Sequence, residues 1–395
     1  MVLASPFPAP RGTQAWISEL STALAELGHD VHLFCYGAGL GGGAPGGVTL
    51  HRAPILPGVR ADLDSAPSAQ RPLNDAALLA TLLRKLPRIR PSVVHGHNHE
   101  GGLAAALAGR FLGFPVVHQI HGSLSEELVA WLEQSLSTSE RARHATGRLE
   151  RLGRRLAAHA GRVLDHSVPR LAHQVLTLDE EAAATAGLRA TKAVALPPGV
   201  SVPEQPLEPG SPRLPSDEAW IVYPGNLDPY QSLGLLADAW PLVRRELPSA
   251  RLALVTHDRG GHRLASLPGV RLMRPRSSSD AQSLVASSRF VVIPRTGGGG
   301  YPLKLLNALG LGVPVVASRP SAKGLDERAG VMSVECSAEA LAAGVLGLLR
   351  DEELRLSLRD NALSFARANS WRRVAEVVAG VYDRLRGEAE GVRRP

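Results

Sequence analysis

Cysteine, aromatic residues and long apolar runs are all scarce in this chain of 395 residues. The two cysteines, Cys35 and Cys336, lie far apart and form no disulfide framework, which fits a reducing compartment. Aromatic residues make up 4% of the sequence and no recognised nucleic-acid module is present, so nucleic acid is not an expected partner. No apolar run approaches the ~20 residues of a transmembrane helix, and no basic segment followed by an apolar one opens the sequence as a secretory signal would. A cytoplasmic protein is therefore expected.

Positive charge is in excess, with 44 Lys and Arg against 37 Asp and Glu and a net charge of +7. The basic residues concentrate around Arg84-Lys85, Arg88 and Arg90, and again from Arg141 to Arg162. Two interpretations remain open. These residues form either a solvated helix face or a peripheral contact with an anionic membrane, to which each well-placed cation contributes about 1 kcal/mol.

Short apolar runs alternate with segments of helical periodicity, which is typical of parallel sheets covered by helices on both faces. Residues 40–45 and the proline-rich stretch after them are expected to be loops. The expected strands of the first half are Val2–Ala4, Val31–Cys35, Val93–Gly96, Val116–Ile120, Gln174–Leu178 and Val194–Leu196, and the expected helices are Thr13–Leu27, Ala76–Leu86, Gly102–Leu112, Ser139–Ala160 and Glu180–Gly187.

The length predicts roughly two to three domains. Residues 197–215 are rich in Pro, Gly, Ser and Glu without apolar periodicity, and predict a linker between domains at 1–196 and 216–370. Residues 352–386 are predicted to be helical throughout. The other expected elements of the second half are strands Trp220–Tyr223, Arg251–Val255, Val270–Met273, Phe290–Pro294 and Val313–Ala317, and helices Leu233–Arg245, Ser279–Ala286, Tyr301–Leu311 and Ala338–Leu349.

The segment Phe290–Ser318 is the most informative part of the chain. It reads as a buried strand, a loop with four glycines at 297–300, a helix and a second buried strand. Glycines before a helix let its first N–H groups approach a ligand closely, and the helix dipole favours an anion there. Arg295 and Lys304 flank this point, and Asn307 follows Lys304 on the same helix face. A site for a phosphate and a polyol is predicted; a loose surface loop is the alternative.

Several histidines lie near strand ends in the first half. His95, His97 and His99 alternate, but no Cys or carboxylate cluster of suitable spacing accompanies them, so no metal site is expected. Ligands of open parallel sheets sit outside the carboxyl ends of the strands. His97 and Asn98 are therefore interpreted as hydrogen-bonding groups that line a cleft, and His121 as a group at the next strand end. His118 is expected to pack on the opposite face of its strand.

These motifs resemble those of the retaining family 4 glycosyltransferases (glycosyl transferases group 1). The resemblance covers nearly the whole chain and implies an α/β fold of GT-B architecture, with two Rossmann-like parallel-sheet domains facing a central cleft. It also implies that the terminal helix, residues 371–395, crosses back to the N-terminal domain. The segments that carry it are Ser5–Pro8 with Gly12, Gly28–Val31, Val93–His97, His121-Gly122, Pro198–Val200, Tyr223–Asp228, Gly300–Pro302 and Gly312–Val316.

The resemblance also assigns roles to residues of this chain. Gly12, Thr13 and Gln14 would face the sugar and the acceptor, together with His97 and Asn98, and His121 would sit beside the reacting sugar. Arg295 and Lys304 would stabilise the leaving phosphate, and Asn307 would hold the ribose. The remaining expected donor contacts are Gly225, Asn226, Gln231, Gly299, Gly300, Tyr301, Pro302 and Leu303.

The donor site departs from the family pattern. Asn226 and Gln231 stand where the family has an Arg and a Lys that grip the diphosphate, and Gly299 and Asn307 stand where it has paired glutamates. Three explanations compete. Arg295 and Lys304 supply the missing charge from the other side of the phosphates, which we favour; the donor has a different leaving group, such as a lipid phosphate; or catalysis has been lost.

The expected function is therefore transfer of a sugar from a nucleotide-sugar donor to a glycan, lipid or small-molecule hydroxyl, with retention of configuration. No cofactor or protein-bound metal is expected. The alternatives are an inactive relative that serves as a binding partner in glycan assembly, or a transferase that uses a lipid-phosphate sugar. The expected location is cytoplasmic, with peripheral contact at the inner face of the membrane as an option. The sequence leaves open the sugar, the base, the acceptor, the pathway and the oligomeric state.

Overall fold

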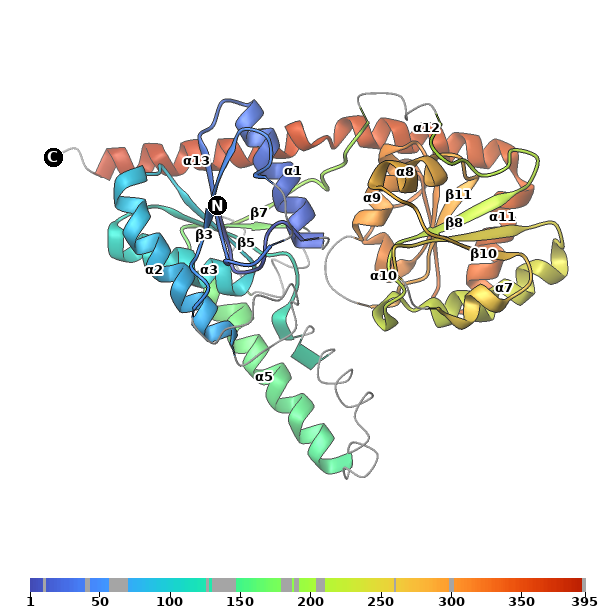
Figure 1. Ribbon diagram of the computed structural model, residues 1–395, viewed down its shortest axis with the longest axis horizontal. Coiled ribbons are helices and arrows are strands. Elements are labelled where there is room, and N and C mark those ends of the chain that lie inside the picture. The colour runs from blue at the N-terminus through green and yellow to red at the C-terminus, as the bar shows by residue number, and fades with distance from the viewer. Residues whose placement is uncertain are drawn as a thin grey trace. The chain divides into compact units, whose positions relative to one another are not determined.

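The computed structural model describes residues 1–9, 12–39, 43–56, 70–125, 128–129, 147–178, 187, 192–203, 210–258, 261–297 and 302–392. The chain divides into two compact units (Figure 1). The first unit consists of Met1–Pro197 together with Trp371–Pro395, and the second consists of Pro198–Ser370. The last segment of the chain therefore belongs to the same unit as the first.

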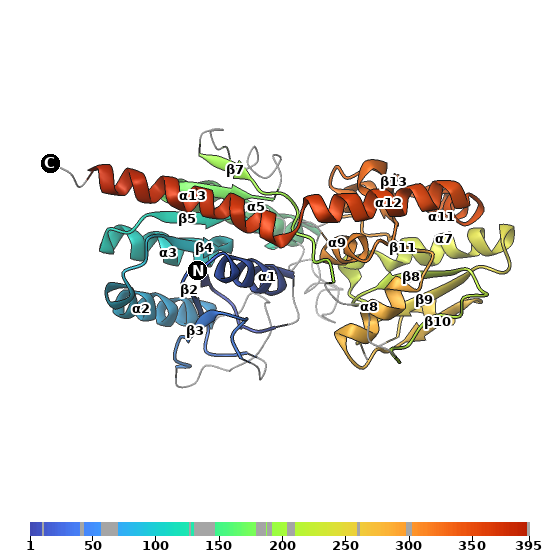
Figure 2. The same cartoon turned by 90° about the horizontal axis from the view of Figure 1, so that it is seen from above.

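The first unit is built on a parallel sheet in the order β3-β2-β1-β4-β5-β6-β7. The C-terminal helix α13 runs beside α1 over one face of this sheet (Figure 2), and α5 projects beyond it (Figure 1). The strands are β1 (Val2–Leu3), β2 (Val31–Cys35), β3 (Val48–Arg52), β4 (Val94–His97), β5 (Val116–Gln119), β6 (Gln174–Thr177) and β7 (Ala193–Ala195), and the helices are α1 (Gly12–Glu26), α2 (Arg71–Ile89), α3 (Asn98–Leu112), α5 (Gly147–Leu171) and α13 (Trp371–Val392).

The second unit has a parallel sheet in the order β10-β9-β8-β11-β12-β13. The 3-10 turns among its described residues are Pro229–Gln231, Arg263–Ser266 and Glu327–Ala329. The strands are β8 (Trp220–Pro224), β9 (Arg251–Val255), β10 (Val270–Met273), β11 (Phe290–Ile293), β12 (Val315–Ser318) and β13 (Val331–Val334), and the helices are α7 (Leu233–Glu246), α8 (Ser278–Ala286), α9 (Leu303–Gly310), α10 (Arg319–Ala322), α11 (Ala338–Arg350) and α12 (Glu352–Ala368).

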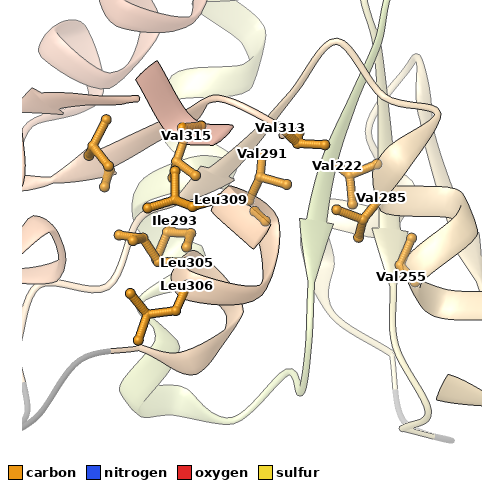
Figure 3. Packing of buried hydrophobic residues seen from close by; sticks show 14 of the residues in the cluster. Val222, Val255, Val285, Val291, Ile293, Leu305, Leu306, Leu309, Val313 and Val315 are labelled. Carbon is orange, nitrogen blue, oxygen red and sulfur yellow. The ribbon is translucent and has the colours of Figure 1, made fainter. Parts of the chain in front are cut away.

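Helix α9 is fixed to the second sheet by an apolar face. Leu305, Leu306 and Leu309 are fully buried and pack among β-branched residues of the central strands, including Val291 and Ile293 (Figure 3). Burying a side chain of this size contributes about 1.5–3 kcal/mol. This packing holds the N-terminus of α9, and Lys304 with it, at the end of β11.

Both sheets are wholly parallel, as the alternating pattern predicted. Two strands, β3 and β13, and a break between two helices were missed from the sequence. Both missed strands lie at sheet edges, and their partly exposed polar residues hide the apolar pattern. The helix predicted over residues 352–386 is broken at Asn369–Ser370, where Val200 N–H donates to Asn369 O at 2.9 Å and Ser370 forms a parallel bridge with Val200. The predicted helices at 139–160 and 180–187 lie partly outside the described residues.

Candidate functional site

Each sheet has a point at which the order of its strands along the chain reverses, so that the chain continues toward opposite edges of the sheet from two neighbouring parallel strands. In the second unit β8 leads to β9 and β10 on one side, whereas β11 leads to β12 and β13 on the other. Ligands of open parallel sheets bind at the carboxyl ends of the strands that flank such a point. Residues Gly225–Gln231 follow β8, and Arg295–Leu303 follow β11. In the first unit, β1 and β4 flank the corresponding point.

Lys304, in the first turn of α9, reaches across to the chain after β8. Its Nζ donates to the hydroxyl of Tyr223 at 2.8 Å and to Oε1 of Gln231 at 2.7 Å. The ammonium also lies 4.5 Å from the centre of the Tyr223 ring, a cation–π geometry. The structure therefore brings together Lys304 and Gln231, two predicted site residues that are 73 positions apart in sequence.

Asn226 and Asp228 extend this network. Gln231 Nε2 donates to Asn226 Oδ1 at 2.7 Å, and Asn226 Nδ2 donates to Asp228 Oδ2 at 2.6 Å. The hydroxyl of Tyr223 donates to the backbone oxygen of Asn226 at 2.6 Å. The loop after β8 is thus held by its own side chains and by Lys304.

Gly225 is the position that admits Lys304. Its φ is +122°, which side chains rarely adopt, and an added Cβ would lie 2.9 Å from Lys304 Nζ. A residue with a side chain would therefore be strained here and would displace the ammonium.

Arg295 provides a second cation close to Lys304. Its side chain is buried, and its backbone oxygen accepts hydrogen bonds from the hydroxyls of Ser318 and Ser321. Burial, and after it the charge of Arg295, lower the pKa of Lys304 to about 7, while Asp228 opposes this shift. Two cations held this close to each other favour an anion between or beside them.

The other predicted donor residues differ in how far their side chains are exposed. Pro302 is buried as the N-cap of α9, Leu303 is partly buried, and the Asn307 side chain is exposed. Gly299, Gly300 and Tyr301 lie outside the described residues.

At the start of α1, the predicted acceptor-side residues differ in exposure. Gly12 is exposed and Thr13 partly so, whereas Gln14 is buried and its Nε2 donates to Ser5 Oγ at 2.7 Å. Gln14 thus ties α1 to the loop after β1. Its amide holds the chain that would present Gly12 and Thr13.

His121 and His97 form a hydrogen-bonded pair at the carboxyl ends of β5 and β4. His97 Nδ1 and His121 Nε2 are 3.1 Å apart, and His97 also stacks on His95, with ring centres 4.2 Å apart. His97 is fully buried and therefore does not itself line a surface, contrary to the sequence interpretation. Burial lowers the pKa of His121 to about 3, and the imidazole is therefore neutral at physiological pH.

The terminal helix α13 contributes to this histidine cluster. The hydroxyl of Tyr382 lies 2.6 Å from His95 Nδ1. Trp371, at the start of the same helix, packs edge-on against Trp16 of α1, which in turn lies 6.0 Å from the ring of His121. Neither Tyr382 nor Trp16 was identified from the sequence, because a single aromatic residue in a helix carries no signal for its distant partner.

His99 and His118 belong to a separate cluster on the other face of the sheet, where His118 was expected. His99 Nε2 lies 2.8 Å from Asp165 Oδ1, and His118 Nε2 lies 3.0 Å from Asn98 O. Asp165 also accepts from the backbone N–H groups of Leu124 and Ser125. His99 is thus directed away from His95 and His97. In the part of the chain that the structure describes, no group of three or more His, Cys, Asp or Glu side chains is placed to hold a metal ion.

Within the same described residues, no helix combines the length and the hydrophobicity that crossing a membrane requires.

Two family models match the chain, one for each half. The model described as Glycosyltransferase Family 4 matches residues 10–202, and the model described as Glycosyl transferases group 1 matches residues 218–351. Curated relatives include a phosphatidyl-myo-inositol mannosyltransferase of Mycobacterium tuberculosis, 27% identical over 214 residues, which are 51% of this chain and 56% of the relative. One of the same name from Propionibacterium freudenreichii is 26% identical over 40% of this chain and 41% of the relative. The chain thus spans about half the length of the curated relatives it matches.

Solved structures with the same fold cover almost the whole chain. A sucrose-phosphate synthase from Thermosynechococcus elongatus superposes with a TM-score of 0.70 at 17% identity, covering 95% of this chain and 94% of that one. HepE from Anabaena in complex with UDP has a TM-score of 0.66 at 14% identity, over 96% and 98%. WaaG, a glycosyltransferase of lipopolysaccharide biosynthesis, has a TM-score of 0.65 at 17% identity, over 96% and 98%.

With both halves matched in order and two parallel-sheet units of the GT-B type, the chain belongs to glycosyltransferase family 4.

Proposed function

We propose that this protein transfers a sugar from a nucleotide-sugar donor to an acceptor hydroxyl of a glycan, a lipid or a small molecule, with retention of configuration. The observation that carries the proposal is the pair of cations, Lys304 and Arg295, at the carboxyl ends of the strands where the strand order of the second sheet reverses. A diphosphate leaving group gains negative charge as the glycosidic bond breaks. Cations already fixed at that point stabilise the charge without reorganisation.

Lys304 suits this task in detail. An ammonium has three N–H donors, and two of those of Lys304 are bound to Tyr223 and Gln231 within the described residues. The third would bind a phosphate oxygen. Asn307, exposed one turn later on α9, would hydrogen-bond the ribose.

His121 would act at the acceptor side. Its Nε2 is engaged by His97, so Nδ1 is the nitrogen that would meet the reacting sugar or the acceptor hydroxyl. Because the ring is neutral, it would orient a hydroxyl and not act as a strong acid. In a retaining transfer on one face of the sugar, the leaving phosphate itself would take the acceptor proton. Positioning and charge stabilisation would then supply most of the rate, and no cofactor or protein-bound metal would be needed.

The relatives support a nucleotide-sugar donor. HepE has been solved with UDP and with UDP-glucose, and the mycobacterial relatives are named phosphatidyl-myo-inositol mannosyltransferases. A lipid acceptor would bring the protein to a membrane surface. On the first unit, Phe111 is 79% exposed beside the exposed Arg110, on a helix that packs against α2, which carries the exposed Arg84 and Arg88. An exposed apolar ring next to a cation, on a unit that carries further exposed arginines, suits an anionic lipid surface.

Nucleotide binding provides the test. Purified protein should be stabilised by one of UDP, GDP, ADP or dTDP, by about 2.7 kcal/mol at a hundred times the dissociation constant. Lys304→Ala should weaken that binding ten- to a hundredfold, because a hydrogen bond to a charged group contributes roughly 1.5–3 kcal/mol. Lys323→Ala, elsewhere in the same unit, is the matched control and should bind like the wild type. Equal affinity in both variants would refute the phosphate assignment.

One observation favours a second function. Gly299 and Asn307 stand where the resembled family has glutamates, and an amide with no carboxylate partner would hold a sugar less firmly. The protein would then be a non-catalytic partner in glycan assembly that still binds nucleotide. Incubation with the nucleotide sugar whose nucleotide binds, followed by chromatography of the products, separates the two functions. Hydrolysis or transfer supports the enzyme, and binding without turnover supports the partner. A response only to a polyprenyl phosphate would point to a lipid-phosphate donor.

A further inference from the structure

Four side chains of the second unit form one continuous hydrogen-bonded row. Asp228 Oδ2 accepts from Asn226 Nδ2 at 2.6 Å, Asn226 Oδ1 accepts from Gln231 Nε2 at 2.7 Å, and Gln231 Oε1 accepts from Lys304 Nζ at 2.7 Å. The row begins with a carboxylate in the loop after β8 and ends with an ammonium on α9. Two amide side chains join these opposite charges.

The direction of every hydrogen bond in this row is fixed from both ends. An ammonium only donates, so Gln231 must turn its oxygen to Lys304 and its nitrogen to Asn226. An ionised carboxylate only accepts, so Asn226 must turn its nitrogen to Asp228 and its oxygen to Gln231. The two requirements agree, and neither amide can flip without losing bonds on both sides.

The row has a buried centre, which strengthens it. Gln231 is 4% exposed, although Asp228 at the outer end is exposed. Hydrogen bonds in such surroundings are stronger than in water, and an unpaired group there is costly. The groups around Lys304 are Tyr223 of β8, Asp228 in the loop after it and Arg295 after β11, and Tyr230 lies 3.0 Å from Asn226 Nδ2. Burial and Arg295 oppose the charged form of Lys304, and Asp228 supports it.

We propose that Asp228, Asn226 and Gln231 act as a relay that positions the ammonium of Lys304 and keeps it charged for the donor phosphate. Asn226 and Gln231 stand where the resembled family has two cations, and they are then positioning residues for a different cation, Lys304. The inference rests on the proposed function only in naming the phosphate. The effect of the relay on Lys304 belongs to the ligand-free protein. Because burial brings the pKa of Lys304 to about 7, affinity for a diphosphate should fall as the pH rises above neutrality.

Amine labelling tests the relay without any ligand. The sequence has lysines only at positions 85, 192, 304 and 323, so acetylation by trace acetic anhydride can be followed at each one by mass spectrometry as a function of pH. Lys304 should lose its proton at lower pH in Asp228→Asn and in Gln231→Leu than in the wild type. A shift of half a pH unit would raise its labelling about threefold below the midpoint. Asp238→Asn is the matched control and should leave the curve unchanged, because Asp238 lies on α7 and pairs with Arg263.

A charge exchange separates the relay from a general structural role. Asn226→Asp alone puts a second carboxylate beside Asp228, so the acids repel each other and the row is broken. Adding Asp228→Asn moves the single negative charge to position 226, where it still accepts from Gln231. Compared with Asp228→Asn alone, the double variant should raise the Lys304 midpoint back to the wild-type value or above it. Unchanged Lys304 curves in Asp228→Asn and Gln231→Leu, in variants whose circular dichroism shows folding, would overturn the proposal.

Binding measurements complete the test. Gln231→Leu should weaken binding of the nucleoside diphosphate about tenfold, since it leaves Lys304 without one partner. Affinity in the wild type should fall with pH above 7, and this fall should begin at lower pH in Asp228→Asn. If the labelling shifts occur but no nucleoside diphosphate binds to any form, the relay stands and the proposed function is refuted. If nucleotide binds equally to the wild type and both variants and the labelling curves of Lys304 also coincide, the relay is refuted.

Discussion

Acid should destabilise the first unit well before the second, because its core holds several imidazoles that must stay neutral. His118 is the clearest case. It is 1% exposed, contacts the chain at Gly102 and lies 3.0 Å from Asn98 O. Burial lowers its pKa from 6.5 to about 3. The pKa values of His95, His97 and His121 are also lowered, first by burial.

The size and sign of the effect follow from proton linkage. Above pH 6.5 neither the folded nor the unfolded chain protonates His118, and stability does not depend on it. Between pH 6.5 and the folded pKa of about 3, only the unfolded chain binds the proton, so stability falls as the pH falls. The loss is about 1.36 kcal/mol per pH unit, or about 2 kcal/mol for this imidazole at pH 5. His95, His97 and His121 cause further losses of the same sign. The free energy of unfolding of a whole protein is typically about 5–15 kcal/mol, so these losses are a substantial part of it.

The second unit is an internal control. Of the 14 histidines only His257 and His262 belong to it, and burial lowers the pKa of His262, so one loss of the same sign is expected there too. Lys304 also gives little slope there below neutral pH, because its folded pKa is about 7 and it is charged in both states once the pH lies below that value. Asp326 is a carboxylate of the second unit whose pKa is lowered, first by its hydrogen bonds with the Arg328 side chain, and it loses its contribution only at still lower pH.

Hydrogen exchange measured by mass spectrometry resolves the two units in one experiment. Between pH 7.5 and 5, after correction for intrinsic exchange, opening free energies of peptides from β4 and β5 should fall by several kcal/mol, and those from β9 and β11 by much less. His118→Gln retains a donor toward Asn98 O and should remove about 2 kcal/mol of the fall at pH 5. His159→Gln, on the exposed side of α5, should not alter it. An equal slope in both units, or no difference between the two variants, would refute the reasoning.

Three further predictions concern other parts of the molecule. Gly225→Ala should lower the melting temperature and weaken nucleotide binding at least tenfold, because the strained backbone and the new methyl displace Lys304; wild-type affinity would contradict the geometry. Tyr382→Phe should cost about 1–3 kcal/mol in urea denaturation by leaving buried His95 Nδ1 without its partner, with Tyr230→Phe, an exposed tyrosine of the second unit, as a control that should cost less. Phe111→Ser combined with Arg110→Ser should reduce co-sedimentation with anionic vesicles but not nucleotide affinity, and unchanged sedimentation would exclude this surface from membrane contact.

Much of the fold could be predicted because its central strands are apolar runs with clear ends. The predicted bounds of β2, β9 and β10 agree with the structure, since each strand is followed or preceded by polar or turn-forming residues. Of the four edge strands, β7 and β10 were predicted, whereas β3 and β13 were missed because their partly exposed polar residues interrupt the apolar run. The break at Asn369–Ser370 was missed for a different reason. It is set by a backbone pairing with Val200, and a residue 170 positions away leaves no local signal.

The candidate site was predictable in its parts but not in its connections. The sequence identified Lys304, Gln231 and Asn226, yet as separate contacts to the donor and not as partners of one another. Tyr223 was part of the motif Tyr223–Asp228, but only the structure shows that its hydroxyl accepts a hydrogen bond from Lys304 and donates one to the backbone oxygen of Asn226. His97 was predicted to line a cleft, and it is instead fully buried and hydrogen-bonded to His121. Periodicity gives the side of a strand on which a residue lies, but it does not give the depth of its burial.

The arrangement around Lys304 also explains how the site can lack the two cations that the resembled family carries after β8. The loop after β8 and the start of α9 meet where the strand order of the sheet reverses, so a side chain from either can reach the same point. Here the loop supplies two amides, and the chain after β11 supplies Arg295 and Lys304, so the number of cations is again two. The exchange has a consequence for charge, because a buried Lys next to an Arg is costly to keep protonated. An acceptor row leading to a carboxylate offsets that cost, whereas a second lysine at position 231 would add to it. Gln231→Lys should therefore not strengthen diphosphate binding in this protein unless Lys304 is first replaced by a neutral residue, and a gain in affinity from the single substitution would show that the two positions act independently.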